Sequence, residues 1–431
     1  MYWCRAALIF TLFLAGCADK QSVGAKKNET FFKYSDINTT IDLEAMKGFH
    51  LLGDAKSKDA LEVFYMLYKT TKKPIFLKEA LKIAFVIKDD RLDELITDAR
   101  EILNADYDVI RIEIGYYILK SQIKDAKDLA LNLIQKESNN SINHSILATI
   151  YLFNDEPIRA LKEFKKAYEI EGSEENLLKL VDMLDNKLDR TNEAIRYLNN
   201  WIGENGCSKP VCFTLLNIYS AKGELDLMIE VYIKLYEAYE ESDFLNRALE
   251  ILLYKKDVIS AKELLEKYGF NEPILMEIYA ELKEFQKAYN VAQDLYNRSQ
   301  NPEYMARMAI YKYEQSSKNI SKFELDMVVK LFEGSVYALN SPIYFNYYGY
   351  LLIDYEIDLK KGLDIAKKAY ILDPNSPYII DSIAWGYFKL GECKEAKMWM
   401  DKIQSDTKFM KEDEAKAHKT AIDKCFNKGT K

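Results

Sequence analysis

Apolar residues recur along this chain with one spacing between about residue 42 and residue 405. Counting from a small or apolar residue, an apolar or aromatic residue follows at +3, usually an alanine at +12, and further apolar residues at +16 and +19. Positions three apart share one face of a helix, and so do positions +12, +16 and +19, so the pattern predicts two helices joined by a turn. The sets are Gly48, Leu51, Ala60, Phe64, Leu67; Ala148, Tyr151, Ala160, Phe164, Ala167; Leu216, Tyr219, Met228, Tyr232, Leu235; Leu249, Leu252, Ala261, Leu265, Tyr268; Met276, Tyr279, Ala288, Ala292, Leu295; and Ala384, Tyr387, Ala396, Met400, Ile403.

The pattern is interrupted between +3 and +12 by turn-forming residues. These stand at 154–157 (Asn-Asp-Glu-Pro), 221–224 (Ala-Lys-Gly-Glu) and 389–392 (Lys-Leu-Gly-Glu). A small residue at +12 lets the two helices approach closely, so we expect a repeated helical hairpin. The segments 84–103, 114–133, 175–201 and 303–339 fit this register only with shifts.

The repeat is clearest between residues 342 and 405. Asn346-Tyr347-Tyr348-Gly349-Tyr350 leads through Leu372-Asp373-Pro374-Asn375 to Ala384-Trp385-Gly386-Tyr387, although Gly362 replaces the usual alanine. This stretch resembles the C-terminal repeat pair of many bacterial tetratricopeptide proteins, whose repeat is about 34 residues long. The resemblance implies an all-α fold, a right-handed superhelical solenoid of helical hairpins.

The predicted repeat region, 42–405, has room for about eleven tetratricopeptide-like helix pairs. A capping helix and tail are expected over 406–431, with the helix itself at 411–427. Terminal helices keep an open stack soluble by presenting a polar outer face, and Asp413, Lys416, Lys419 and Asp423 would form it here.

Residues 1–17 form a short apolar segment behind Arg5 and end in Leu14-Ala15-Gly16-Cys17. Its apolar part, 6–15, is too short to span a bilayer, so we interpret it as a secretion signal. The segment resembles the signal peptide and lipobox of bacterial lipoproteins, which implies removal of the first 16 residues and acylation of Cys17. Acyl chains would hold the protein on a membrane surface. The alternative is a plain signal peptide with a cysteine near its cleavage site.

Ala18 follows the cysteine, whereas an aspartate there resembles an inner-membrane retention signal. We therefore expect an outer-membrane lipid anchor facing the periplasm, with exposure on the cell surface as the alternative. The polar segment 18–41 would be a tether between anchor and folded body.

Composition narrows the function classes. The chain has 431 residues, 16 glycines, 8 prolines and a net charge of −8, so a helical fold is favoured and nucleic acid is an unsuitable partner. No nucleotide-binding, hydrolase or metalloprotease motif is present. His50, His144 and His418 lie in different repeats and are expected to pack or face solvent. We expect no cofactor, no metal and no small-molecule substrate.

Four cysteines remain after Cys4 and Cys17 are set aside, an even number in a chain expected in an oxidising compartment. Cys207 and Cys212 join a loop to the start of a helix, and Cys393 and Cys425 begin and end helices that are expected to be antiparallel. We predict the pairs Cys207–Cys212 and Cys393–Cys425, with buried free thiols as the alternative.

Tyrosine is abundant, with 31 residues, and most of these occupy repeat core positions. Tyr344, Tyr347, Tyr348 and Tyr350 are candidates for partner binding, because tyrosines on the concave face would supply contact area and hydrogen bonds. A purely structural role in the core is the alternative.

These features indicate a membrane-anchored, non-enzymatic scaffold for protein–protein interaction in a cell-envelope assembly. A periplasmic carrier or chaperone that holds client polypeptides in its groove is the second hypothesis. An enzyme acting on the cell wall is the third.

Overall fold

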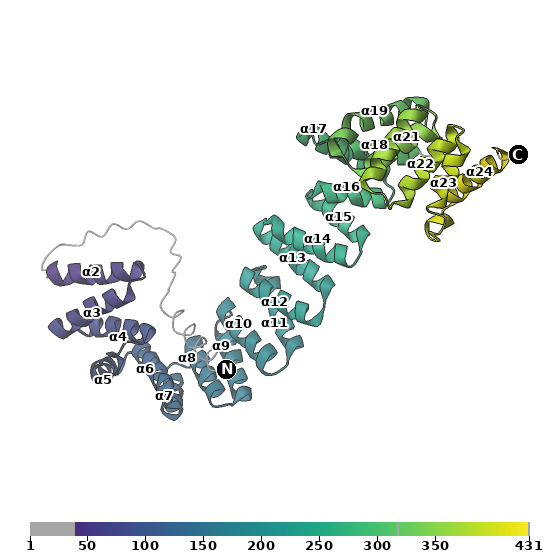
Figure 1. The fold of residues 1–431 in the computed structure, drawn as a ribbon. Helices are drawn as coiled ribbons and strands as arrows, with labels where there is room; N and C mark the ends of the chain where they lie inside the picture. Colours follow the sequence, from purple (N-terminus) through teal and green to yellow (C-terminus); the bar gives the residue numbers. More distant parts are fainter. Residues whose placement is uncertain (1–38, 317–318, 430–431) are drawn as a thin grey trace. The chain divides into compact units, whose positions relative to one another are not determined.

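The computed structural model describes residues 39–316 and 319–429, in which every regular element is helical (Figure 1). The expected signal, Cys17 and most of the tether lie outside the described residues. Within the described part, no helix is both long and apolar enough to cross a membrane. The chain forms two compact units, one ending at Leu245 and the other beginning at Asn246.

The first unit consists of short antiparallel helices that follow one another along the chain. They are α2 (Thr39–Gly53), α3 (Ser57–Thr71), α4 (Pro74–Ile87), α5 (Leu92–Ile102), α6 (Tyr107–Leu119), α7 (Ile123–Lys136), α8 (Ser141–Phe153), α9 (Pro157–Ile170), α10 (Glu174–Asp182), α11 (Thr191–Asn205), α12 (Lys209–Lys222) and α13 (Leu225–Tyr239). A π-helical turn, η2 (Met183–Lys187), continues α10.

Helix α14 (Ser242–Tyr254) contains the boundary between the units. The second unit continues with α15 (Val258–Tyr268), α16 (Glu272–Glu281), α17 (Phe285–Ser299), α18 (Pro302–Ser316), α19 (Lys322–Leu339), α20 (Pro342–Asp354), α21 (Leu359–Leu372), α22 (Pro377–Lys389), α23 (Cys393–Asp401), the 3-10 turn η4 (Phe409–Lys411) and α24 (Asp413–Gly429).

From α2 to α23 the helices form eleven successive hairpins, and we call the first helix of each hairpin A and the second B. In the ten hairpins whose A–B turn is fully described, one turn residue has a left-handed backbone. From Ala55 through Lys88, Ser121, Asp155, Asp189 and Gly223 to Lys256, successive members of this series lie 33 or 34 residues apart. The turn therefore repeats with the period of the predicted repeat.

Each hairpin closes around the fourth residue of its B helix. In seven hairpins this residue is an alanine with no exposed surface, and these are Ala60, Ala126, Ala160, Ala194, Ala261, Ala288 and Ala396. A methyl side chain keeps the two helices close while their larger side chains interdigitate on either side. The predicted small residue at +12 is this contact.

Gly362 occupies the same position in α21, and the structure explains why it is smaller than alanine. A Cβ atom on Gly362 would lie 2.9 Å from the carbonyl oxygen of Gly349 in α20, and a Cβ atom on Gly349 would lie 2.9 Å from the backbone nitrogen of Ala366. The backbones of α20 and α21 meet directly at these two glycines. The departure from the repeat pattern is thus a closer helix crossing.

Two of the irregular segments have local causes. In 175–201 the π-helical turn η2 adds backbone before the turn and moves Ala194 out of register. In 303–339 the connection between α18 and α19 is longer than elsewhere. Segment 114–133 follows the regular spacing after all, with Ile114 and Ala126 both fully buried.

The last helix, α24, begins at Asp413, two residues after the expected start, because η4 occupies 409–411. Its apolar side buries Ala415 and Ile422, whereas Asp413 and Lys416 are exposed. Asp423 departs from the expected outer face, since its carboxylate lies 3.1 Å from Lys397 Nζ of α23 and 2.6 Å from Lys419 Nζ.

These helices confirm the predicted fold class within each unit: an all-α solenoid of tetratricopeptide-like hairpins. The turns at 154–157, 221–224 and 389–392 separate A from B helices as predicted.

Replacing Gly349 with alanine tests the glycine crossing. The new methyl group would meet the backbone of α21, which cannot move without separating the helices, so we expect a loss of about 1–3 kcal/mol in the free energy of unfolding. Gly386→Ala in α22 is the matched control, because its Cβ would meet only the ends of the Ile353 and Leu363 side chains. Its thermal midpoint should stay near that of the wild type, and equal losses for both variants would contradict the crossing.

Candidate functional site: the A-helix face of the C-terminal hairpins

Two of the four candidate tyrosines belong to the core and not to a surface. Tyr344 and Tyr348 are buried, at 6% and 0% exposure, because they lie one turn apart on the side of α20 that packs on its neighbours. Tyr344 donates its hydroxyl hydrogen bond to Glu303, and Tyr348 donates to Glu333 at 2.9 Å. The partner-binding interpretation is therefore corrected for these two residues.

Tyr347 and Tyr350 lie on another side of α20 and are half-buried. The Tyr347 hydroxyl donates to Glu314 of α18 at 3.5 Å, and the Tyr350 hydroxyl donates to Glu414 of α24. Both tyrosines therefore connect α20 to other helices of the A-type face, and they remain candidates for partner binding.

Acidic and aromatic side chains link successive A helices on this face. Besides Tyr347 and Glu314, the indole nitrogen of Trp385 in α22 donates to Asp354 of α20 at 3.0 Å. We call the set made of Tyr313, Glu314, Tyr347, Tyr350, Asp354, Asp381, Trp385, Glu414 and His418 the A-helix cluster. The cluster draws on α18, α20, α22 and α24, all within the second unit.

The face is concave at this point. In a solenoid each repeat contacts its immediate neighbours. Tyr350 of α20 instead reaches past α22 to Glu414 of α24, and its ring centroid lies 6.3 Å from that of His418. A side chain spans this distance only where the intervening helix is recessed, so α20 and α24 form two walls with α22 as the floor.

The floor contains a buried acid–histidine pair. His418 is 4% exposed, its Nδ1 lies 2.8 Å from Asp381 Oδ2, and its ring stacks on Trp385 with centroids 3.9 Å apart. Burial raises the pKa of Asp381 despite the adjacent imidazole. The second carboxylate oxygen, Oδ1, is buried without a hydrogen-bond partner. His418 thus has the packing role expected of it, and it also positions Trp385.

The accessible rim of the cluster carries negative charge in a partly desolvated setting. Burial raises the pKa of Glu314, and Glu414 adds to that shift. Burial raises the pKa of Tyr347 to about 12 and also raises that of Tyr350. Tyrosines in this state are neutral hydrogen-bond donors, so the negative charge of the cluster resides on its carboxylates.

In the described part of the chain, no lysine or arginine nitrogen lies within ion-pair distance of Glu314, Asp354 or Glu414, although many other acids of the protein are paired in this way. The described residues also include no group of three or more His, Cys, Asp or Glu side chains that suits a metal ion. The arrangement is therefore chemically suited to bind organic cations or hydrogen-bonding groups.

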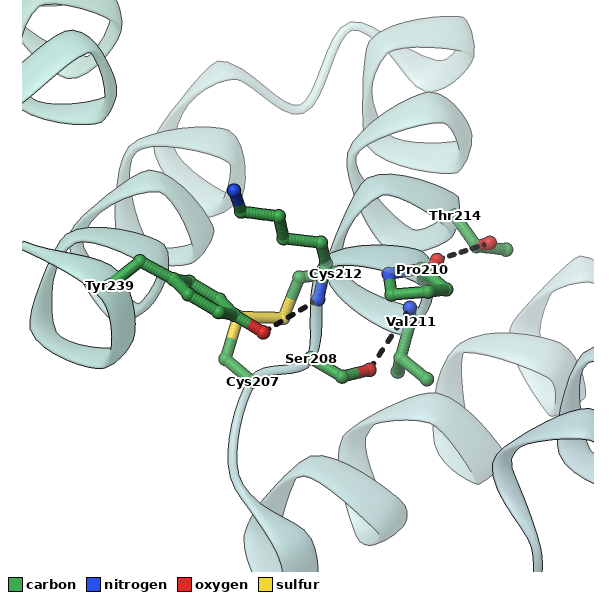
Figure 2. The surroundings of a disulfide bond; sticks show 8 residues. Cys207, Ser208, Pro210, Val211, Cys212, Thr214 and Tyr239 are labelled. Atoms are coloured by element: carbon green, nitrogen blue, oxygen red, sulfur yellow. Dashed lines mark hydrogen bonds between the residues drawn. A yellow bond between two sulfur atoms is a disulfide. The ribbon is translucent and has the colours of Figure 1, made fainter. Parts of the chain in front are cut away.

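Cys207 and Cys212 are joined in the structure, with Cα atoms 5.8 Å apart (Figure 2). Ser208 between them caps α12, since its hydroxyl accepts from the Val211 amide. Lys209 donates its backbone N–H to the Tyr239 hydroxyl at 3.1 Å, which connects the loop to the end of α13. This bridge is a local staple far from the A-helix cluster in sequence.

Cys393 and Cys425 are also brought together, with Cα atoms 5.6 Å apart. This pair connects the start of α23 to the far end of α24, as the antiparallel arrangement requires. Because α24 supplies Glu414 and His418, the second bridge supports one wall of the A-helix cluster.

His144 and His50 lie away from the cluster. His144 is buried and contacts Glu163 at 2.7 Å and the carbonyl oxygen of Ser138 at 3.1 Å. The His50 side chain is 77% exposed. The three histidines do not meet, in agreement with their separate repeats.

Sequence reasoning missed Asp381, Trp385, Glu414 and His418 as members of one site. A usable signal was present: Asp381 and Trp385 are one helical turn apart in an otherwise apolar A helix, where a lone charge is costly without a partner. Nothing in the spacing identified His418, 37 residues later, as that partner.

The two cysteine pairs make a graded prediction. Loop-closure entropy predicts a loss of about 2 kcal/mol on removing the Cys207–Cys212 bridge and about 4 kcal/mol on removing the Cys393–Cys425 bridge, which closes a longer loop. Unfolding curves of the two double serine variants would measure this. Thiol labelling of the denatured, unreduced protein should modify none of the four cysteines, and labelling of all four would contradict both pairs.

Comparisons with known proteins add fold likeness only. No protein-family model and no curated protein matches the chain. Among solved structures, MamA from Desulfovibrio magneticus RS-1 is 12% identical with a TM-score of 0.34, over 39% of this chain and 96% of that one. PilF of Pseudomonas aeruginosa is 14% identical with a TM-score of 0.37, over 48% and 95%. Yeast Tom70 is 12% identical with a TM-score of 0.31, over 85% and 99%.

These values are too low to transfer a function. The fold assignment rests on the hairpins themselves, with their 33- to 34-residue turn spacing and the small residue at the fourth position of the B helix. By these features the chain has the architecture of tetratricopeptide-like repeats.

Proposed function

We propose that this protein is a non-enzymatic scaffold that binds another polypeptide on the A-helix face of its C-terminal hairpins. The single observation that supports this most is the A-helix cluster, in which half-buried aromatic rings and unpaired carboxylates occupy a concave face. Rings of this kind provide contact area at a small entropic cost, and their polar atoms give orientation.

The cluster offers recognition without the parts of a catalytic centre. Its one close acid–histidine pair, Asp381 and His418, is buried, and Trp385 stacks on the imidazole. No nucleophilic side chain contacts the histidine among the described residues. A binding role therefore uses every feature of the cluster, whereas hydrolysis of the cell wall would use none of them.

The location forms part of the same proposal. The lipobox-like segment ending in Cys17 supports a lipid anchor, and Ala18 supports the outer membrane with the body in the periplasm. Two pairs of cysteines placed within bonding range suit an oxidising compartment. Together these features support an adaptor in a cell-envelope assembly.

A carrier or chaperone remains the second function. The exposed apolar side chains of the first unit, such as Leu43, Met46 and Phe49 on α2, favour it, because clients with exposed apolar segments would bind there. A scaffold would hold one partner at a fixed ratio, whereas a carrier would hold many partners at low occupancy.

Replacing Cys17 with alanine tests the anchor. The variant should leave the membrane fraction of the source bacterium and appear in the soluble envelope fraction, since acyl chains supply the membrane affinity. Wild-type protein, carried through the same carbonate wash and separation of inner and outer membranes, is the control. A variant that stays in the membrane pellet would contradict the lipid anchor.

A photo-crosslinking amino acid at position 414 tests the scaffold. Glu414 is exposed on the A-helix cluster, so illumination in living cells should trap one abundant partner there. The same amino acid at position 395, an exposed site on helix α23, is the matched control and should trap little. Many weak adducts at position 414 would favour the carrier, and equal adducts at both positions would contradict binding on this face.

A further inference from the structure

We propose, on the basis of the interaction role above, that the A-helix cluster recognises a basic segment of its partner, with an arginine side chain entering between Tyr350 and Trp385. The partner is identified by this chemistry alone: an extended polypeptide that carries guanidinium groups.

Charge is the first step of the argument. Glu314, Asp354 and Glu414 come from three different helices and face the same recess, and each accepts a hydrogen bond only from a neutral ring donor in the described structure. Tyr313 and Tyr350 both experience the negative field of Asp354 and Glu414. Three carboxylates that share one recess and have no cation of their own form a site with a deficit of positive charge.

The nearby cations do not remove this deficit. Lys389 places its Nζ 2.7 Å from Glu356 and 3.5 Å from the backbone oxygen of Asp354, so its charge is directed toward the turn after α20. Lys312 pairs with Glu324 at 2.9 Å on the side of α19. His418 is buried against Asp381. The carboxylates of the rim therefore remain available to an incoming cation.

The buried floor supplies an independent observation. Asp381 is 6% exposed, its Oδ1 has no partner, and it lies beneath Trp385 one helical turn away. A buried carboxylate oxygen without a hydrogen bond is unfavourable in a stable fold. A cation placed above the Trp385–His418 stack would stabilise this negative charge through a short, poorly screened distance.

Geometry favours arginine over lysine. A guanidinium is planar, so it stacks on the faces of aromatic rings and at the same time donates in its plane to carboxylates on either side. Tyr350 and Trp385 provide the rings, and Asp354 and Glu414 provide carboxylates from opposite walls. An ammonium group would meet the same charges but would gain less from the stack.

The experiment measures binding of a labelled twelve-residue peptide, four repeats of Arg-Gly-Ser, to the purified full-length protein by fluorescence anisotropy. We expect saturable binding, with at least tenfold weaker binding when citrulline replaces every arginine, because citrulline keeps the shape and loses the charge. Lysine in place of arginine should bind with intermediate strength. Equal binding of the arginine and citrulline peptides would overturn the proposal.

A pair of variants with equal charge changes separates this site from general attraction to an acidic protein. Asp354→Asn with Glu414→Gln keeps the acceptor oxygens used by Trp385 and Tyr350, so the fold should persist, and the affinity for the arginine peptide should fall at least tenfold. The control, Asp364→Asn with Glu395→Gln, removes two exposed charges from α21 and α23 and should change the affinity less than twofold. Equal losses in the two variants would overturn the site.

A single substitution gives a second readout if the double variant is unstable. Glu414→Gln alone changes one exposed residue, and circular dichroism would report whether the helices remain. The outcome is also distinguishable from failure of the scaffold. If position 414 traps a partner but the arginine peptide does not bind, the basic segment is wrong and the scaffold stands; if position 414 traps nothing while the peptide binds, the scaffold fails.

Discussion

The close approach of the two helices in each hairpin is the constraint on which the rest of the structure depends. Seven B helices place an alanine with no exposed surface at their fourth residue, and α20 and α21 meet at Gly349 and Gly362. Because dense packing leaves no space at this contact, a larger side chain would separate the helices and remove the contacts on both sides. The short left-handed turn before the B helix then determines where that residue falls.

This constraint frees the opposite side of the A helices. Once the core is formed by the A–B contact, positions on the A face are no longer needed for packing within the hairpin and are used between hairpins. In the second unit they carry acid–ring hydrogen bonds, such as Tyr347 to Glu314 and Trp385 to Asp354. Each of these bonds links one A helix to another, so the same side chains that align the hairpins also form the A-helix cluster.

The sequence predicted what depends on local spacing. Helix type, turn positions, the small residue of the B helix and the final helix all follow from periods of a few residues, and the structure agrees with them. Register failed where the π-helical turn η2 added backbone, because a single inserted residue leaves no mark in composition. The cluster could be predicted only in part. Tyr347 and Tyr350 were recognised, but Tyr344 and Tyr348 are core residues, since the rotation of α20 relative to its neighbours decides which tyrosines are buried.

The capping helix α24 connects stability to recognition. It ends the stack by burying Ala415 and Ile422, it pairs His418 with the buried Asp381, and it presents Glu414 to the recess. Cys393 and Cys425 fix its far end to α23. A wall that belonged to a regular repeat would have to satisfy the next hairpin as well, whereas a terminal helix has one packed side only. Its other side is therefore free to differ from the repeat, and this explains why the cluster is built around α24.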